Sequence, residues 1–248
     1  MIPKIIWQTH EWEYEDLPIN HKRSADTWKN LNPGWDYRYI SSQERKNIVH
    51  SLDPYLHDLF FLEERNSPLY STGKIHQADI FRYLVTYEYG GVYADMDSVC
   101  RQPLDYMLSL IDRPYEVLMS KEKNSPNNNA MFAAVPKSSA LENIIRKIKS
   151  SPIRQQKYNT EELPDPNTGI HYSTHFFPDG SLHSIWNQEV KLNTDVIPLF
   201  SAGSHSKDYL TFPSDKIESE WLGMVEKVDF YGEVIQYKKL MERQGISI

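Results

Sequence analysis

Apolar side chains recur at helical spacing through residues 71–89, the clearest periodic stretch of the chain. This spacing predicts a helix, and Gly90-Gly91 predicts its end because glycine tolerates the backbone conformations that stop a helix. A short apolar run at residues 92–94 follows at once and predicts a buried strand. The apolar positions of the predicted helix are Ile75, Ala78, Ile80, Phe81, Leu84, Val85 and Tyr87.

Helical and strand-like stretches alternate along the rest of the chain, which predicts an α/β sandwich rather than an all-α or all-β fold. A hydroxyl at Ser41 and the pair Asp53-Pro54 each predict the start of a helix. Residues 152–167 are polar and contain prolines, which predicts an excursion from the packed fold. Further strands are predicted at residues 4–8, 37–40, 116–119, 130–135 and 195–199, and further helices at 24–31 and 138–150.

Composition narrows the class of protein. A length of 248 residues predicts one large domain or a domain with a small appendage. The 27 basic and 34 acidic side chains give a net charge of −7, so we expect no general binding of nucleic acid, which needs a cationic surface. Cys100 is the single cysteine, which excludes an intramolecular disulfide and a four-cysteine zinc site and fits a reducing compartment.

Nothing in the sequence predicts a membrane-spanning segment. No apolar stretch approaches the roughly 18–20 residues that a spanning helix needs. The N-terminus, MIPKIIWQTHEWEYED, turns acidic after a few apolar residues and lacks the apolar core of a signal peptide. We therefore expect a cytoplasmic protein that is soluble or peripheral to a membrane.

Two carboxylates, Asp95 and Asp97, directly follow the predicted buried strand. Residues at i and i+2 of a strand point to the same face, so both side chains can approach one bound cation. Hard oxygen ligands suit Mg²⁺ or Mn²⁺, which also bind phosphate oxygens and can neutralise a leaving diphosphate. A solvated acidic turn is the alternative, but the apolar strand before the pair favours metal binding.

Asp79 and Arg82 stand three residues apart on the long predicted helix and so share a face. One interpretation is a surface ion pair of little energetic weight, and spacing alone favours it. The other interpretation is that both side chains face the metal and hold sugar hydroxyls through charge-assisted hydrogen bonds.

Three segments together make the sequence similar to glycosyltransferase family 32. They are IPKIIWQTH near the N-terminus, NPGWDYRYI at residues 32–40, and ADIFRYLVTYEYGGVYADMD at residues 78–97. The resemblance implies a GT-A fold, which is a Rossmann-like α/β domain with a mixed central sheet flanked by helices. It implies one domain over residues 1–248, in which 1–100 bind the nucleotide sugar and 101–248 supply the acceptor side and a C-terminal lid.

The resemblance also implies a nucleotide-sugar donor, a Mn²⁺ or Mg²⁺ cofactor and transfer with retention of anomeric configuration. Carried over residue by residue, Asp97 would ligate the metal directly, and Asp95 would bridge ribose or donor sugar and a metal-bound water. Asp79 and Arg82 would grip the donor sugar's hydroxyls. Asp95, Asp97 and Arg82 would form the catalytic group that stabilises the departing diphosphate.

Three further residues are candidates for the donor site. Trp7 stands where related toxins place a tryptophan that stacks on uracil, and the alternative is a core aromatic on an edge strand. Tyr93 is expected to pack beside the acidic pair and to offer its hydroxyl to the donor. Asn129 would reach the donor from a later strand, with a turn asparagine as the alternative.

The C-terminal third departs from the family pattern, so its candidate site residues are individual residues and not parts of a motif. His205 is a candidate phosphate or metal contact, with a solvated loop histidine as the alternative. Ser219 and Trp221 are candidates for a lid that closes over the diphosphate, and Trp221 could instead anchor a helix face. His183 with Trp186 is a further candidate pair.

The sequence therefore predicts a retaining, metal-dependent glycosyltransferase of glycan or polysaccharide biosynthesis. It would move a hexose from a UDP-sugar or GDP-mannose to a hydroxyl acceptor. A metal-dependent hydrolase of sugar nucleotides or phosphodiesters is one alternative, although no further His or Asp ligands flank residues 95–97. A non-catalytic carbohydrate-binding GT-A module, with aromatic side chains as sugar platforms, is the other.

Overall fold

A six-stranded mixed sheet forms the centre of the protein, with strand order β2-β1-β3-β6-β5-β7. The computed structural model describes residues 1–61, 70–96, 98–100, 102–109, 111, 114–121, 128–150, 186, 196–201 and 225–227. The sheet strands are β1 (Ile5–Thr9), β2 (Asp36–Ile40), β3 (Gly91–Ala94), β5 (Val117–Lys121), β6 (Asn128–Ala134) and β7 (Val196–Ser201). A separate two-stranded sheet pairs β4 (Ser98–Cys100) with β8 (Val225–Lys227).

Strand direction changes once on each side of β6. β1 runs parallel to both β2 and β3, and β5 runs parallel to β7. β6 is antiparallel to both of its neighbours, β3 and β5. The carboxyl ends of β1, β2 and β3 therefore meet at one edge of the sheet, and the first residues of β6 lie at that same edge.

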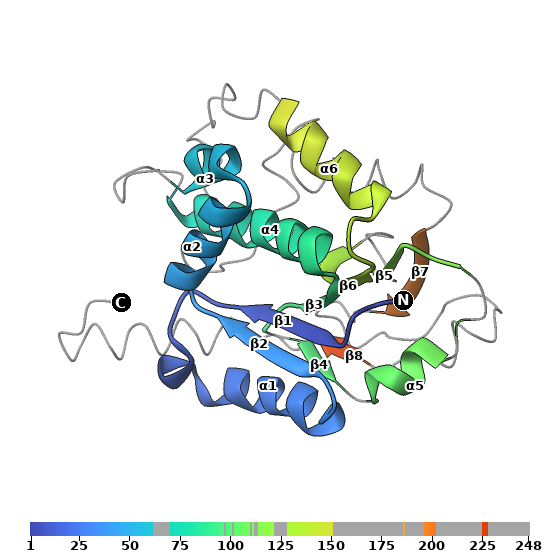
Figure 1. The fold of residues 1–248 in the computed structure, drawn as a ribbon. Helices are drawn as coiled ribbons and strands as arrows, with labels where there is room; N and C mark the ends of the chain where they lie inside the picture. Colours follow the sequence, from blue (N-terminus) through green and yellow to red (C-terminus); the bar gives the residue numbers. More distant parts are fainter. Residues whose placement is uncertain are drawn as a thin grey trace.

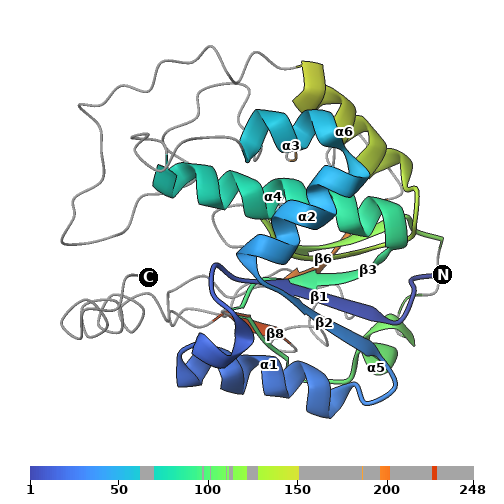
Figure 2. The same cartoon turned by 60° about the vertical axis from the view of Figure 1, so that its left-hand side comes forward.

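Helices cover both faces of the sheet (Figures 1 and 2). On one face lie α1 (Ile19–Leu31) and α5 (Leu104–Ser109). The other face carries α2 (Ser42–Leu52), α3 (Pro54–Phe60), α4 (Tyr70–Tyr89) and α6 (Ser139–Ser150), and a short 3₁₀ helix, η1 (Tyr14–Asp16), precedes α1. This arrangement confirms the predicted α/β class, with a mixed central sheet flanked by helices.

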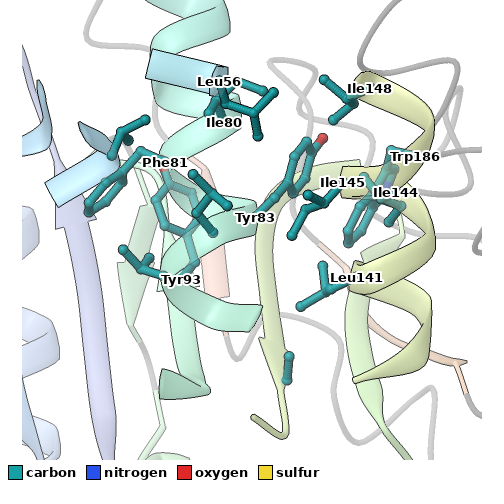
Figure 3. Packing of buried hydrophobic residues seen from close by; sticks show 14 of the residues in the cluster. Leu56, Ile80, Phe81, Tyr83, Tyr93, Leu141, Ile144, Ile145, Ile148 and Trp186 are labelled. Atoms are coloured by element: carbon teal, nitrogen blue, oxygen red, sulfur yellow. The ribbon is translucent and has the colours of Figure 1, made fainter. Parts of the chain in front are cut away.

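The core has a layer on each side of the sheet because successive strand residues point to opposite faces. Trp7 and Tyr93 face α4 in the larger layer, whereas their neighbours Ile6 and Val92 pack on the α1 side. Figure 3 shows the larger layer, in which Tyr83 of α4 and the isoleucines of α6 meet Trp186. Burying each large apolar side chain contributes about 1.5–3 kcal/mol, so this layer holds α4 and α6 to the sheet.

Gly90 and Gly91 let α4 turn directly into β3. Both have positive φ, 69° and 100°, which other residues rarely adopt. A Cβ on Gly91 would lie 2.6 Å from the main-chain oxygen of Ile5. The two glycines thus allow β3 to pair closely with β1 and set the helix directly above the strand that leads to Asp95.

Most predicted elements are present with small shifts of their ends. Ser41 is the N-cap residue of α2, where its amide donates to Oε2 of Glu44, and the side chain of Asp53 accepts from the amide of Leu56 at the start of α3, so both helices begin where predicted. The first helix begins at Ile19 rather than at residue 24. The sequence analysis missed β4, α5 and β8, and its predicted excursion at 152–167 lies outside the described residues.

None of the helices in the described part of the chain is long and apolar enough to cross a membrane.

Candidate functional site

Four polar side chains meet at the carboxyl end of β3. Asp79 and Arg82 come from the face of α4 that covers the sheet, Asp95 directly follows β3, and Asn129 is the second residue of β6. Asp79 and Arg82 share one face of α4 because they are three positions apart, and this is the face on which the apolar residues of α4 pack against the sheet. Because β6 runs antiparallel to β3, the first residues of β6 lie beside the end of β3, and this brings Asp95 and Asn129 to the same edge of the sheet.

Arg82 is the centre of this group. Its Nη2 lies 3.3 Å from Oδ1 of Asp79 and 3.2 Å from Oδ1 of Asp95. Its Nη1 donates to the main-chain oxygen of Asn129 at 2.7 Å, and the guanidinium lies 4.5 Å from the ring centroid of Tyr93. Burial alone would lower the pKa of Arg82, but Asp95, Tyr93 and Asp79 raise it above its ordinary value. The site therefore holds a permanent cation.

Asp79 is 7% exposed and accepts a hydrogen bond from Nδ2 of Asn129 at 3.0 Å. Burial raises the pKa of Asp79 to about 6, although Arg82 opposes the rise. The nearby carboxylate of Asp95 adds to the increase. Asp79 is thus an anion at neutral pH that takes up a proton in mildly acidic solution.

Two buried phenols close the group. Tyr93 donates from its hydroxyl to Oδ1 of Asp95 at 2.8 Å. The hydroxyl of Tyr83 accepts from Nδ2 of Asn129 at 2.6 Å, and its ring stacks on Trp186 at 5.4 Å between centroids. Burial raises the pKa of both phenols well above 10. Both hydroxyls therefore stay protonated and act only as neutral hydrogen-bonding groups.

Asp95 is the most exposed member, with a quarter of its side-chain surface accessible. Its amide donates to the main-chain oxygen of Ala130 at 2.8 Å, so the residue is held to β6. Its own main-chain oxygen accepts from Nε2 of Gln8 at 3.1 Å and from the amide of Ser98 at 3.0 Å. The backbone is pinned while the carboxylate reaches the surface.

The donor set fits a hard divalent cation. In the part of the chain that the structure describes, no three His, Cys, Asp or Glu side chains cluster as metal ligands. Mg²⁺ and Mn²⁺ do not need such a cage, because they bind through one or two carboxylates, several waters and phosphate oxygens. Asp95, partly exposed at a strand end, is a suitable oxygen ligand, and Asp97 lies outside the described residues.

The structure brings together Asp79, Arg82, Tyr93, Asp95 and Asn129, five of the residues singled out from the sequence. It shows that the surface ion pair favoured for Asp79 and Arg82 is wrong, because the two residues are buried, 7% and 5% exposed, and Arg82 contacts Asp95 as well as Asp79. The turn alternative for Asn129 is also wrong, since the residue belongs to β6.

Trp7 is corrected by the structure. Its side chain is 2% exposed, its indole N–H donates to the main-chain oxygen of Gly90 at 2.9 Å, and its ring packs near Phe81 and Tyr89. Such a ring has no face left to stack on a base. The core alternative therefore describes Trp7, although β1 is an internal strand and not an edge.

Trp186, considered with His183 as a closing pair, is also a core residue. It is fully buried and packs against Tyr83 and Phe132 (Figure 3). The other C-terminal candidates, His183, His205, Ser219 and Trp221, lie outside the described residues, as does Asp97.

Two polar contributors escaped the sequence analysis. Tyr83 directly follows Arg82 in a helix whose apolar pattern accounts for its ring, so nothing pointed to its hydroxyl. Gln8 follows three apolar residues in strand β1 and is fully buried. A polar residue inside an apolar strand was a usable signal, since buried amides need partners.

Comparison with known families and proteins gives a consistent set of matches. A family model described as "Glycosyltransferase sugar-binding region containing DXD motif" matches residues 18–146, just over half of the chain. Inositol phosphoceramide mannosyltransferase 2 of Schizosaccharomyces pombe is 28% identical over 151 residues, which cover 61% of this chain and 39% of that protein. Initiation-specific alpha-1,6-mannosyltransferase of Candida albicans is 26% identical over 125 residues, 50% of this chain and 30% of that protein. The chain thus matches less than half the length of these curated relatives.

Solved structures with a related arrangement are more distant. The glycosyltransferase PaToxG aligns with a TM-score of 0.43 at 16% identity, over 77% of this chain and 69% of that one. A glycosyltransferase involved in the glycosylation of the major capsid of PBCV-1 aligns with a TM-score of 0.41 at 13% identity, over 97% of this chain and 100% of that one. At these TM-scores neither likeness bears on the chemistry of this chain.

Proposed function

Because the chain belongs to the family of glycosyltransferase sugar-binding regions that contain a DXD motif, we propose that it is a retaining, divalent-metal-dependent hexosyltransferase. It moves a hexose from a nucleotide sugar to a hydroxyl acceptor. The observation that carries the proposal is the buried cation of Arg82 held between Asp79 and Asp95 at the carboxyl end of β3. Open α/β sheets bind their ligands at this edge.

The donor is bound through groups that the chain supplies itself. Asp79 accepts hydrogen bonds from donor hydroxyls, and the Arg82 cation attracts the diphosphate and orients the sugar. The ring of Tyr93 lies against Arg82, and Asn129 bonds to both Arg82 and Asp79, so the polar groups are positioned before the donor arrives. Asp95 and Asp97 would hold a Mn²⁺ or Mg²⁺ ion, and the bound ion would neutralise charge on the leaving diphosphate.

Retention of configuration is proposed to follow from front-face attack. The acceptor hydroxyl approaches the anomeric carbon on the side of the departing diphosphate, and a phosphate oxygen takes up its proton. Arg82 stabilises the negative charge that grows on the diphosphate as the bond between the anomeric carbon and the phosphate oxygen breaks and the bond to the acceptor oxygen forms. The family resemblance supports this route.

Domain organisation and substrates extend the same proposal. Residues 1–100 form the nucleotide-sugar half of one GT-A domain, and 101–248 supply the acceptor side and lid. GDP-mannose is the first donor to test, because the named relatives are mannosyltransferases, and UDP-hexoses come next. The acceptor is a hydroxyl of a glycan or glycolipid.

The test is release of nucleoside diphosphate from each donor with Mn²⁺, measured with and without acceptor. We expect acceptor-dependent release and a glycosylated product, both lost with Asp95→Asn and Asp97→Ala. Asp36→Asn is the matched control, since Asp36 is an exposed carboxylate that pairs only with Arg38 among the described contacts. Equal release without acceptor would instead identify the hydrolase, and donor binding without turnover the non-catalytic module.

A further inference from the structure

Two main-chain oxygens on either side of Asp97 are each held by two donors. The oxygen of Asp95 accepts from Nε2 of Gln8 and from the amide of Ser98. The oxygen of Ser98 accepts from Oγ of Ser24 and from Nε1 of Trp28, both at 2.6 Å. We call Asp95, Met96 and Ser98 the acidic turn, and its two held carbonyls stand before and after Asp97 in the sequence, which itself lies outside the described residues.

The side-chain donors to the acidic turn come from elements that supply none of the sugar-binding candidates. Gln8 lies on β1, whereas Ser24 and Trp28 lie one helical turn apart on α1, on the opposite face of the sheet from Arg82. All three side chains are at most 1% exposed. Water therefore cannot replace a lost donor without opening the core, and each carbonyl depends on its protein partners.

The amide of Gln8 is itself oriented. The hydroxyl of Tyr37 on β2 donates to Oε1 of Gln8 at 2.8 Å, which leaves Nε2 to donate to Asp95. Burial raises the pKa of Tyr37 above its usual value, so the phenol remains a donor. A chain of hydrogen bonds thus runs across three neighbouring strands, from Tyr37 through Gln8 to the backbone of Asp95.

We propose that Gln8, Ser24 and Trp28 are positioning residues that preset the backbone of the acidic turn for a divalent cation. The inference rests on the proposed function for the presence of that cation. Mg²⁺ and Mn²⁺ tolerate little distortion of their ligands, so a loose turn would bind them more weakly even with both carboxylates intact. These three residues touch neither the cation nor the sugar and act only through the main chain.

The experiment measures Mn²⁺ binding by electron paramagnetic resonance, in the presence of GDP or UDP and without any turnover. Gln8→Leu removes a donor with little change in side-chain size, and Trp28→Phe removes a donor while keeping an aromatic ring. We expect each to weaken Mn²⁺ binding on the order of tenfold, the cost of one buried hydrogen bond. Tyr37→Phe and Ser24→Ala are milder variants that should also weaken Mn²⁺ binding. They replace the larger changes in the experiment if those changes impair folding.

Trp35→Phe is the matched control. Its indole N–H is also largely buried but donates to Asp105, away from the acidic turn. We expect it to lower the melting temperature as Trp28→Phe does and to leave Mn²⁺ binding unchanged. Hydrogen exchange of the peptide containing residues 95–98 should quicken in Gln8→Leu and Trp28→Phe and not in the control.

Two failures are distinguishable. If the wild-type protein binds no Mn²⁺ with either nucleotide, the proposed function and this inference both fall. The second failure requires that the wild type binds Mn²⁺. If the variants at Gln8, Ser24, Trp28 and Tyr37 then bind Mn²⁺ as tightly as the wild type, only the positioning role is overturned. The same holds if Trp35→Phe weakens Mn²⁺ binding as much as they do.

Discussion

Nη2 of Arg82 lies 3.2 Å from Oδ1 of Asp95, although one residue stands on a helix and the other follows a strand. The contact joins the sugar-binding candidates of α4 to the acidic turn. A cation at this position lowers the repulsion between Asp79 and Asp95, which would otherwise oppose each other across the same space. The first prediction follows from that balance.

Arg82→Gln should reduce kcat/KM by about 100-fold, the size of effect expected when a preorganised charge at a leaving group is lost. The free energy of unfolding should fall by about 3 kcal/mol, because the buried carboxylate of Asp79 and the partly exposed carboxylate of Asp95 lose their shared partner. Steady-state kinetics and urea denaturation check both effects. Arg146→Gln on the exposed face of α6 is the control, and it should change neither quantity.

Asp79 should impose a pH dependence on stability. Its pKa in the folded state is about 6, above the usual 3.8, so the folded protein binds the proton more tightly than the unfolded chain. The resulting contribution is fully present below pH 3.8 and is lost as pH rises through about 6. It amounts to about 3 kcal/mol at most.

Asp79→Asn should remove this dependence, so the difference in unfolding free energy between wild type and variant should change between pH 4 and pH 6.5 and stay level above that range. Urea denaturation at several pH values measures it. Donor binding should show the opposite trend in the wild type, strengthening as Asp79 ionises. A difference that is independent of pH would contradict the role of Asp79.

Tyr93→Phe should raise the KM for the donor several-fold and lower stability by about 1 kcal/mol, the value of one hydrogen bond. The phenyl ring still lies under the guanidinium of Arg82, so the charge of the site is retained. Initial-rate kinetics over a range of donor concentrations tests this. Tyr106→Phe, at an exposed tyrosine of α5, should leave the KM unchanged.

Gly91→Ala should destabilise the fold by about 1–3 kcal/mol, because alanine is strained at a φ of 100° and its Cβ would meet the oxygen of Ile5. Gly34→Ala offers a control, since nothing lies within 4 Å of a Cβ there. Thermal denaturation compares the two. Equal melting temperatures for both variants would contradict both the strain at Gly91 and the close contact with Ile5.

The elements that the sequence predicts best are those with a local cause. The spacing of apolar residues in 71–89 and the cap residues Ser41 and Asp53 act within one or two turns, and each helix they predict is present. α5 and β4 are short, and tertiary contacts hold them. Asn32, for example, accepts from the amide of Leu104 at the start of α5 across 72 positions in the sequence.

The site shows the same division. Their spacing predicts that Asp79 and Arg82 share one face of α4, but it does not predict what that face packs against. The interpretation of the two residues as a surface ion pair was wrong for that reason. Only the pairing of β3 with β6 decides that Asn129 meets Asp79. Trp7 failed differently, because a motif position carries no information about which side of the sheet a ring packs on.

The reversed direction of β6 has a consequence for how the site can change over time. Since this strand begins where β3 finishes, Asn129 enters at its first residues, and the remainder of β6 leads away into the core. Deleting one residue between Asn129 and Met131 would alter the amide that meets Asp79 while sparing the register of Ala133 and Ala134 against β3. Small changes at this one strand start therefore alter the groups around Asp79 without rebuilding the sheet.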